Sequence, residues 1–203
     1  MPRASAEVVV QNSPPSAPQA VIEPEHARTR DELACRVSVP SIDPDGDPVT
    51  YTYAWWRNDR PLAGTSGSGR LPALATTNRD RFRCSVTPSD GTINGPAAIA
   101  ERVIVNSPPG RARVALEPRA LAEGQAIRCV VQAKSEDPDG DAVRYRYRWQ
   151  RNRAPQPFAE TSEEIPIRMV RAGDRWRCLV IPTDGDLDGP ESGSEETLVG
   201  ATK

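Results

Sequence analysis

The chain has 203 residues, enough for one domain or two small ones, and its 21 prolines against two phenylalanines argue against a helical bundle. A net charge of −2, from 26 basic and 28 acidic side chains, excludes a strongly basic nucleic-acid binder. No apolar window of about 18 residues occurs, so we expect no membrane insertion. The only histidine, His26, lies in a polar segment without a nucleophile motif nearby, so we expect an exposed loop residue and no enzyme.

An internal repeat organises the chain. The segment NSPP at residues 12–15 recurs at residues 106–109, and the cysteines, the DPDGD runs and the tryptophans recur with the same offset of 94 positions. Self-similarity at a fixed period indicates copies of one structural module. The sequence therefore predicts a first domain at 12–105 and a second at 106–203. We expect residues 1–11 to be the last strand or leader of a preceding repeat.

Apolar residues alternate with polar ones in six segments of the two copies. Alternation over five to seven residues, bounded by proline, glycine and aspartate, predicts half-buried antiparallel strands. Several such strands in about 94 residues favour a β-sandwich. The segments are residues 33–39, 49–55 and 82–86 in the first copy and 127–133, 143–149 and 176–180 in the second.

Each copy carries one cysteine on an early strand and one on a late strand, 49 residues apart. Inward cysteines from opposed sheets can bridge a sandwich core, and closing a loop of about 50 residues would contribute about 4 kcal/mol. We predict the bonds Cys35–Cys84 and Cys129–Cys178, with buried free thiols as the alternative. Bridges imply an oxidising compartment, so we expect an extracellular, cell-surface or periplasmic protein.

Several segments resemble known β-sandwich families. The runs at 55–62 (WWRNDRPL), 33–37 and 80–84 resemble strands C, B and F of immunoglobulin-like domains. The DPDGD run before Tyr-x-Tyr-x-Trp, together with VTPSDG at 86–91, resembles the PKD domain. The resemblance implies an all-β fold: two tandem immunoglobulin-like (PKD-like) antiparallel β-sandwich domains of a bacterial-type cell-surface or secreted protein, with a structural or adhesive role.

The DPDGD loops at 43–47 and 137–141 place carboxylates at alternate positions, as hard cations such as calcium prefer. In an immunoglobulin-like sandwich, Asp90 or Asp184 would lie at the same end. The second copy is the better candidate because residues 184–189 (DGDLDG) add carboxylates. Asp-Pro-Asp-Gly is equally a type I turn sequence, and both interpretations stay open. The candidate calcium ligands are Asp43, Asp45, Asp47, Asp90, Asp137, Asp139, Asp141 and Asp184.

Arginines on one predicted strand of the second copy should point away from the core. They form either a basic face for an acidic polysaccharide or partner, or a solvated face balanced by Glu163, Glu164 and other acids. In the first copy an outward tryptophan could anchor a contact. The candidate ligand-binding residues are Arg144, Arg146, Arg148 and Trp56.

These features favour a non-catalytic structural or adhesive module pair of an extracellular repeat protein, which spaces or displays partners at a cell surface and which calcium could stiffen. The alternative is a pair of carbohydrate- or protein-binding accessory domains of a larger secreted enzyme. The expected partners are neighbouring repeats of the same parent chain and a cell-surface protein or polysaccharide. We expect no nucleic acid among them.

Overall fold

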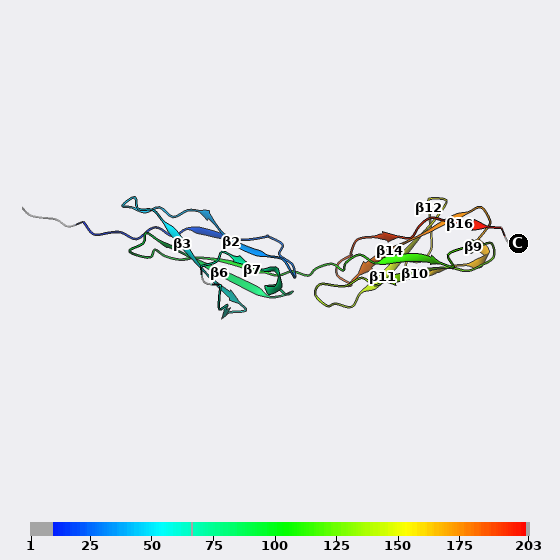
Figure 1. The fold of residues 1–203 in the computed structure, drawn as a ribbon, viewed down its shortest axis with the longest axis horizontal. Helices are drawn as coiled ribbons and strands as arrows, with labels where there is room; N and C mark the ends of the chain where they lie inside the picture. Colours follow the sequence, from blue (N-terminus) through cyan, green and yellow to red (C-terminus); the bar gives the residue numbers. More distant parts are fainter. Residues whose placement is uncertain (1–9, 66, 202–203) are drawn as a thin grey trace, which may run out of the picture. The chain divides into compact units, whose positions relative to one another are not determined.

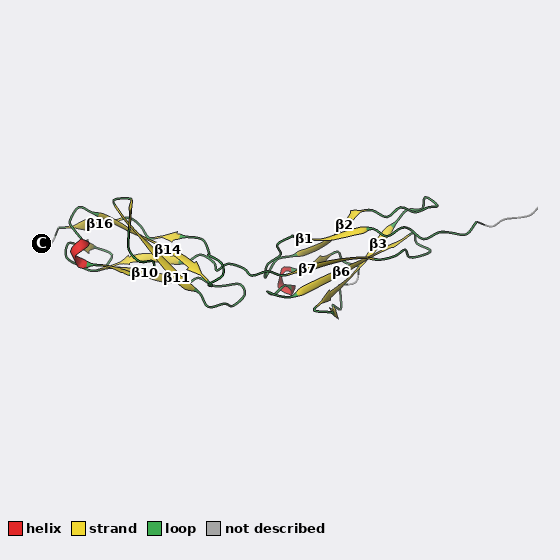
Figure 2. Cartoon of the chain, turned by 180° about the vertical axis from the view of Figure 1, so that it is seen from behind, coloured by secondary structure: helices red, strands yellow, loops and turns green. Residues whose placement is uncertain are grey.

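The computed structural model describes residues 10–65 and 67–201 and divides into two compact units, Met1–Val105 and Asn106–Lys203 (Figure 1). Apart from two single-turn 3-10 helices, Ala73–Ala75 and Ile167–Met169, the regular structure of these residues is β-strand (Figure 2). The strand or leader expected at 1–11 lies outside the described residues except at positions 10 and 11, which form no strand.

The first unit consists of two antiparallel sheets. One has the order β1-β2-β5 and the other the order β4-β3-β6-β7. The longest pairing joins β3 to β6 from Thr50↔Ser89 to Arg57↔Phe82. The strands are β1 (Gln19–Glu23), β2 (Leu33–Val39), β3 (Thr50–Arg57), β4 (Arg60–Pro61), β5 (Arg70–Leu71), β6 (Arg81–Ser89) and β7 (Ala98–Val103).

The second unit repeats this plan with one change in its last strand. One sheet has the order β13-β10-β8, and the other the order β12-β11-β14-β16-β9, with β15 also paired to β14. Among the strands that the structure describes in this unit, only β9 and β16 pair in parallel. The strands are β8 (Arg113–Glu117), β9 (Leu121–Ala122), β10 (Ile127–Ala133), β11 (Arg144–Arg151), β12 (Ala154–Gln156), β13 (Glu164–Ile165), β14 (Arg175–Thr183), β15 (Ser192–Gly193) and β16 (Thr197–Gly200).

Each unit has its own core between its two sheets. Alternation sends every second side chain inward, so Trp55 and Phe82 are fully buried in the first unit and Trp149 and Trp176 in the second. The Trp149 and Trp176 rings pack edge to face, with centroids 6.3 Å apart. The indole N–H of Trp149 donates to the carbonyl of Ser162 at 2.8 Å, which satisfies its buried polar atom. The predicted all-β sandwich fold is confirmed.

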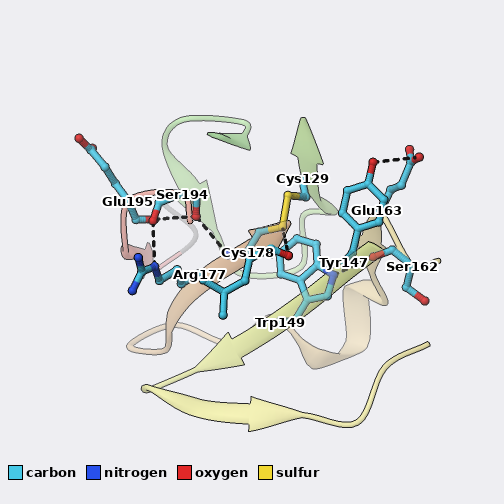
Figure 3. The surroundings of a disulfide bond; sticks show 10 residues. Cys129, Tyr147, Trp149, Ser162, Glu163, Arg177, Cys178, Ser194 and Glu195 are labelled. Atoms are coloured by element: carbon cyan, nitrogen blue, oxygen red, sulfur yellow. Dashed lines mark hydrogen bonds between the residues drawn. A yellow bond between two sulfur atoms is a disulfide. The ribbon is translucent and has the colours of Figure 1, made fainter. Parts of the chain in front are cut away.

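A disulfide joins the two sheets in each unit. Cys35 on β2 bonds Cys84 on β6, and Cys129 on β10 bonds Cys178 on β14, which leaves no free cysteine. Figure 3 shows the second bond beside Trp149 and Tyr147. Burial, together with the neighbouring Glu163 carboxylate, raises the pKa of Tyr147 to about 12. The tyrosine therefore stays protonated and packs as part of the core.

Candidate functional site

The DPDGD run of the first unit folds as a tight turn capped by its first aspartate. The Asp43 Oδ1 atom accepts hydrogen bonds from the backbone N–H of Asp45 at 2.9 Å and of Asp47 at 3.3 Å. Gly46 sits at φ +84°, where a side chain would be strained. The pattern of carboxylates therefore has a structural use without any ion.

The second unit builds the same turn. The Asp137 Oδ1 atom accepts from the N–H of Asp139 at 2.8 Å and of Asp141 at 3.3 Å. Gly140 again has a positive φ, of 83°. The turn interpretation of the motif thus describes the backbone of both loops.

The remaining aspartates hold the segment that precedes the first strand of the same unit. In the first unit, Ser13 donates its backbone N–H to Asp45 Oδ2 at 2.6 Å, and the Asn12 amide donates to Asp90 Oδ2 at 2.8 Å. This set of contacts is called the linker clamp below. It ties the NSPP segment to two loops that are far apart in sequence.

The linker clamp recurs in the second unit with the same donors and acceptors. Ser107 donates its N–H to Asp139 Oδ2 at 2.6 Å, and the Asn106 amide donates to Asp184 Oδ2 at 3.0 Å. All four residues stand 94 positions after their counterparts. Two neutral donors therefore lie between the acidic loops, where a cation was one of the two interpretations of the sequence.

In each unit a glycine packs closely against the backbone of the NSPP segment. A Cβ atom at Gly95 would lie closer than 3.0 Å to the carbonyl oxygen of Pro15, and one at Gly189 equally close to that of Pro109. Backbone cannot yield like a flexible side chain, so these positions require glycine. The sequence reasoning missed both glycines, although their separation of 94 positions was available as a signal.

The clamp aspartate of the later loop also caps its own turn. Asp90 Oδ1 accepts from the N–H of Thr92 at 2.6 Å and of Ile93 at 2.7 Å. The N–H groups of Ile93 and Thr92, together with the Asn12 amide, lower the pKa of Asp90. Hydrogen bonds to the ionised carboxylate therefore favour its charged form.

Asp184 has the same role in the second unit. Its Oδ1 atom accepts from the N–H of Asp186 and of Leu187, both at 2.7 Å. Burial acts to raise the pKa of Asp184, but the hydrogen bonds from Leu187, Asp186 and Asn106 outweigh it, so the pKa lies below its ordinary value. Asp90 and Asp184 thus both carry their charge at neutral pH.

One set of predicted metal ligands gathers within the described part of the chain: Asp137, Asp139 and Asp141 each place a carboxylate oxygen within 4.8 Å of the others. Asp184 is not part of this set, and the matching aspartates of the first unit do not form one. Asp137 Oδ2 is buried without a hydrogen-bond partner, whereas both Asp139 oxygens face Ser107. The donor chemistry suits a hard cation, and one oxygen is free to meet it.

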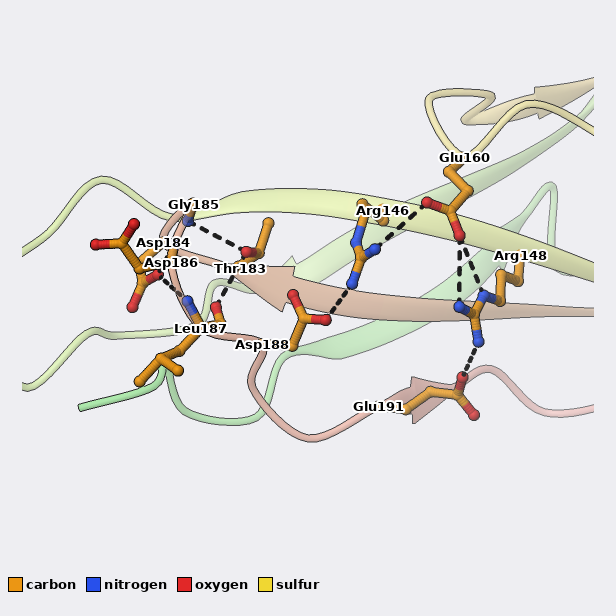
Figure 4. Close-up of polar contacts among 10 residues, drawn as sticks. All are labelled: Arg146, Arg148, Glu160, Thr183, Asp184, Gly185, Asp186, Leu187, Asp188 and Glu191. Carbon is orange, nitrogen blue, oxygen red and sulfur yellow. Dashed lines mark hydrogen bonds and ion pairs between the residues drawn. The ribbon is translucent and has the colours of Figure 1, made fainter. Parts of the chain in front are cut away.

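The predicted basic face of the second unit is neutralised by acids from neighbouring loops (Figure 4). Arg146 bridges Glu160, at 3.5 Å, and Asp188, in a short contact. Arg148 contacts Glu160 at 3.4 Å and Glu191 at 3.8 Å. Opposite charges at these distances cancel most of the field that an acidic ligand would sense.

Glu163 and Glu164, the two acids named from the sequence, make other contacts, and the balance comes from Glu160, Asp188 and Glu191. Glu163 accepts a hydrogen bond from the Tyr147 hydroxyl, and Glu164 pairs with Arg128 on the other sheet. Arg144 is exposed and forms no ion pair with any residue that the structure describes. Arg146 and Arg148 therefore belong to an ion-pair network, and Arg144 lies outside it.

Trp56 lies in the first unit, on the outer side of β3. The guanidinium carbon of Arg83 on β6 sits 4.7 Å from its ring centroid, so one face of the half-buried ring is covered. Trp56 and the three arginines belong to different units and do not form one site within either. His26 is exposed in a turn, as expected.

No family model matches the chain. It is 28% identical over 187 residues to Protocadherin-15 of Mus musculus, which covers 85% of this chain but only 9% of that protein. A crystal structure of the chicken CNTN1 FN1–FN3 domains is similar over 93% of this chain and 68% of the other, with a TM-score of 0.40 and 13% identity. Among the described residues, no helix has the length and apolar character needed to cross a membrane.

Proposed function

We propose that this chain is a non-catalytic pair of extracellular repeats, which spaces or displays partners at a cell surface. The linker clamp carries the proposal, because two equivalent aspartates hold the first two residues of the NSPP segment in each unit. The same contacts recur before each unit, as expected of modules that are used in series. The bridged cores suit an oxidising compartment.

Similarity to a protocadherin, an adhesion-type repeat protein, supports the same class of function. The chain spans only 9% of that protein, so the comparison concerns repeat modules and not the activity of the whole. The partners we propose are neighbouring repeats of the same parent chain and a surface protein or polysaccharide.

The clamp supplies the mechanism of spacing. The two prolines of the NSPP segment fix their own φ angles. The clamp restricts the backbone further, because it anchors the Asn and Ser before these prolines on the unit that follows. Hydrogen bonds to ionised carboxylates are stronger than neutral ones, so two acidic acceptors make a firm anchor. Each joint then moves with its own unit rather than as a free linker.

Amide hydrogen exchange tests the clamp directly. We expect Ser107 N–H to be protected, and Asp139→Ala to speed its exchange about tenfold or more, since the lost bond is worth about 1.5 kcal/mol. Asp186→Ala is the matched control, because no side-chain contact of Asp186 enters the clamp. Exchange of Ser107 in the unaltered chain as fast as in Asp139→Ala would contradict the proposal.

We further propose that calcium binds at Asp137, Asp139 and Asp141 and stiffens the second unit. The buried oxygen of Asp137 supports this, since a hard cation would satisfy it. Saturation at about 100 times the dissociation constant would add about 2.7 kcal/mol. For a unit of this size, that raises the unfolding temperature by about 10 °C.

Thermal unfolding in about 1 mM calcium and in excess chelator separates the two interpretations of the motif. Asp141→Ala is the informative variant, because the Asp141 side chain can be removed without breaking the turn that Asp137 caps. Asp47→Ala in the first unit is the matched control. Superimposable curves with and without calcium would reduce the motif to its turn.

A further inference from the structure

The second unit carries a groove with a volume of about 580 Å3 along the free edge of β8. It is lined by β8, by residues just before and after that strand, by one residue of β10, and by residues of the segment 192–197. The ion-pair network of Arg146 and Arg148 and the linker clamp contribute no residue to the walls of the groove. The residues that matter below are Arg111, Arg113, Arg119, Ser192, Glu195 and Thr197.

The groove arises from a one-residue bulge in the last strand. In the first unit β7 pairs with β6 without interruption, and Phe82 stands opposite Arg102. In the second unit β15 keeps this register, but Trp176 stands opposite Thr197, one residue later than the repeat predicts. Two strand residues then share one partner position, which is a β-bulge, and the strand bends there.

Arg177 holds the bulge open. Its Nε–H donates to the carbonyl of Ser194 at 3.1 Å, and its guanidinium lies against Gly193, where a side chain would clash. The Ser194 hydroxyl in turn accepts from the N–H of Cys178 at 3.1 Å (Figure 3). The bulge is therefore fixed by side chains, not left loose.

In the first unit the equivalent space between β1 and β7 is closed by a side chain. There Arg102 on β7 donates a guanidinium N–H to the carbonyl of Ile22 on β1 at 2.8 Å. In the second unit Leu116 stands in place of Ile22, but the ladder position of Arg102 is taken by Thr197, which is too short to reach across. Glu196, the counterpart of Arg102 in sequence, faces Arg153 instead.

The open groove offers two kinds of unused binding group. As an edge strand, β8 pairs with β10 on one side only, so its other side presents backbone groups to a further strand. Ser192 is 6% exposed, and its hydroxyl has no hydrogen-bond partner. Edge backbone of this kind selects an extended peptide rather than a sugar, because only a peptide can continue the ladder.

The charge of the groove selects acidic side chains. Arg111, Arg113 and Arg119 form no ion pair with another described residue; Arg111 donates only to the carbonyl of Glu191. Against them stands the single carboxylate of Glu195 in the wall. The first unit has alanine, glutamine and glutamate at the three matching positions, 17, 19 and 25.

We propose that this groove binds an extended acidic peptide segment, which adds to the edge of β8 and places its carboxylates on the arginines. The inference rests on the second unit alone and does not depend on the spacer role. It gives that unit a protein-binding face that the first unit lacks.

A short synthetic peptide tests the proposal on the whole chain. The probe is fluorescein-labelled Val-Glu-Val-Glu-Val-Glu, whose glutamates share one face when extended. We expect saturable binding by fluorescence anisotropy, with at least a tenfold loss for Arg111→Glu with Arg113→Glu. Arg175→Glu, an exposed arginine outside the groove, should leave binding unchanged.

Thr197→Arg provides the sharper variant. It restores an arginine at the ladder position of Arg102 and should close the groove, so binding should fall at least tenfold while the unfolding temperature is kept. A peptide methylated at alternate backbone nitrogens should also lose binding, because it cannot extend the ladder. Absence of saturation, an unchanged affinity for Thr197→Arg, or equal affinity for the methylated peptide would each overturn the proposal. Ser107 exchange in Thr197→Arg stays as in the parent, so failure here leaves the clamp test intact.

Discussion

The two units share a 94-residue frame, the same clamp and the same bridge, yet their last strands fill the core with different residues. In the first unit Ile104 is buried and Val105 is 40% exposed. In the second, the counterpart of Ile104 is Leu198, which is 49% exposed, and Val199 is buried instead. One extra residue in the bulge thus inverts which side of the strand faces inward, since side chains alternate with a period of two. From the bulge onward, residues that match in the sequence repeat no longer occupy equivalent positions in the two units.

A second difference accompanies the first on the outer sheet face. Arg83 stacks on Trp56 in the first unit, but the position of Trp56 is taken by Gln150 in the second. Arg177, the counterpart of Arg83, has no ring to cover and turns to the bulge. The bulge and the missing ring are therefore two parts of one local rearrangement.

Removal of one disulfide should have the largest effect on stability and should move the unfolding transition of only the unit that contains it. Replacing both Cys129 and Cys178 by alanine should lower the free energy of unfolding of the second unit by about 4 kcal/mol, because the loop of 49 residues is no longer closed. Calorimetry should show one transition moved and the other in place. The Cys35, Cys84 pair gives the reverse control. A shift of both transitions in either variant would mean that the units unfold together.

Substitution at the clamp glycines should have the next largest effect and should be equal in the two units. Gly95→Ala and Gly189→Ala each drive a Cβ into a proline carbonyl, which should cost about 1–3 kcal/mol in urea unfolding. Gly200→Ala is the control, since its Cβ would meet ordinary contact at 3.5 Å. A tolerated Gly189→Ala beside a costly Gly95→Ala would show that only one clamp is tight.

The stacked pair on the outer face should contribute less. Arg83→Ala should lower the stability of the first unit by about 0.5–1 kcal/mol, because the partly exposed Trp56 ring loses its cation. Arg60→Ala, on the neighbouring edge strand, serves as the control. Chemical denaturation followed by tryptophan fluorescence measures both, and equal losses would place the effect in general charge rather than in the stack.

The smallest effect should appear on acidification. The folded-state pKa values of Asp90 and Asp184 are lowered, so their contribution is complete above the unfolded value of about 3.9 and is lost as pH falls through the folded value. Asp90→Asn should flatten this acid dependence in the first unit only, and Asp184→Asn in the second only. Unfolding temperatures recorded from about pH 5 to pH 2 measure it. A dependence that survives in both variants would assign it to other carboxylates.

The parts of this structure that sequence could predict are those with a local period. Alternation and the repeat predicted three strands in each unit and the inward cysteines, and DPDGD indicated turns at two loops. The predicted strands are β2, β3 and β6 and their counterparts β10, β11 and β14. The bulge had no such signal, because the offset of 94 continues unbroken to the end of the strand and the extra residue is absorbed by an altered register. Glu160 and Glu191 lie in irregular segments, so their pairing with Arg146 and Arg148 follows from tertiary packing that no period reveals.

The linker clamp also shows where one repeat module begins. Because Asn106 and Ser107 are anchored on Asp184 and Asp139, the joint belongs physically to the unit that it introduces. A gene duplication that copies the joint with that unit delivers donors and acceptors together, so every added copy arrives with its own anchoring already complete. A copy that begins at the NSPP segment therefore contains both the donors and the acceptors of its own clamp.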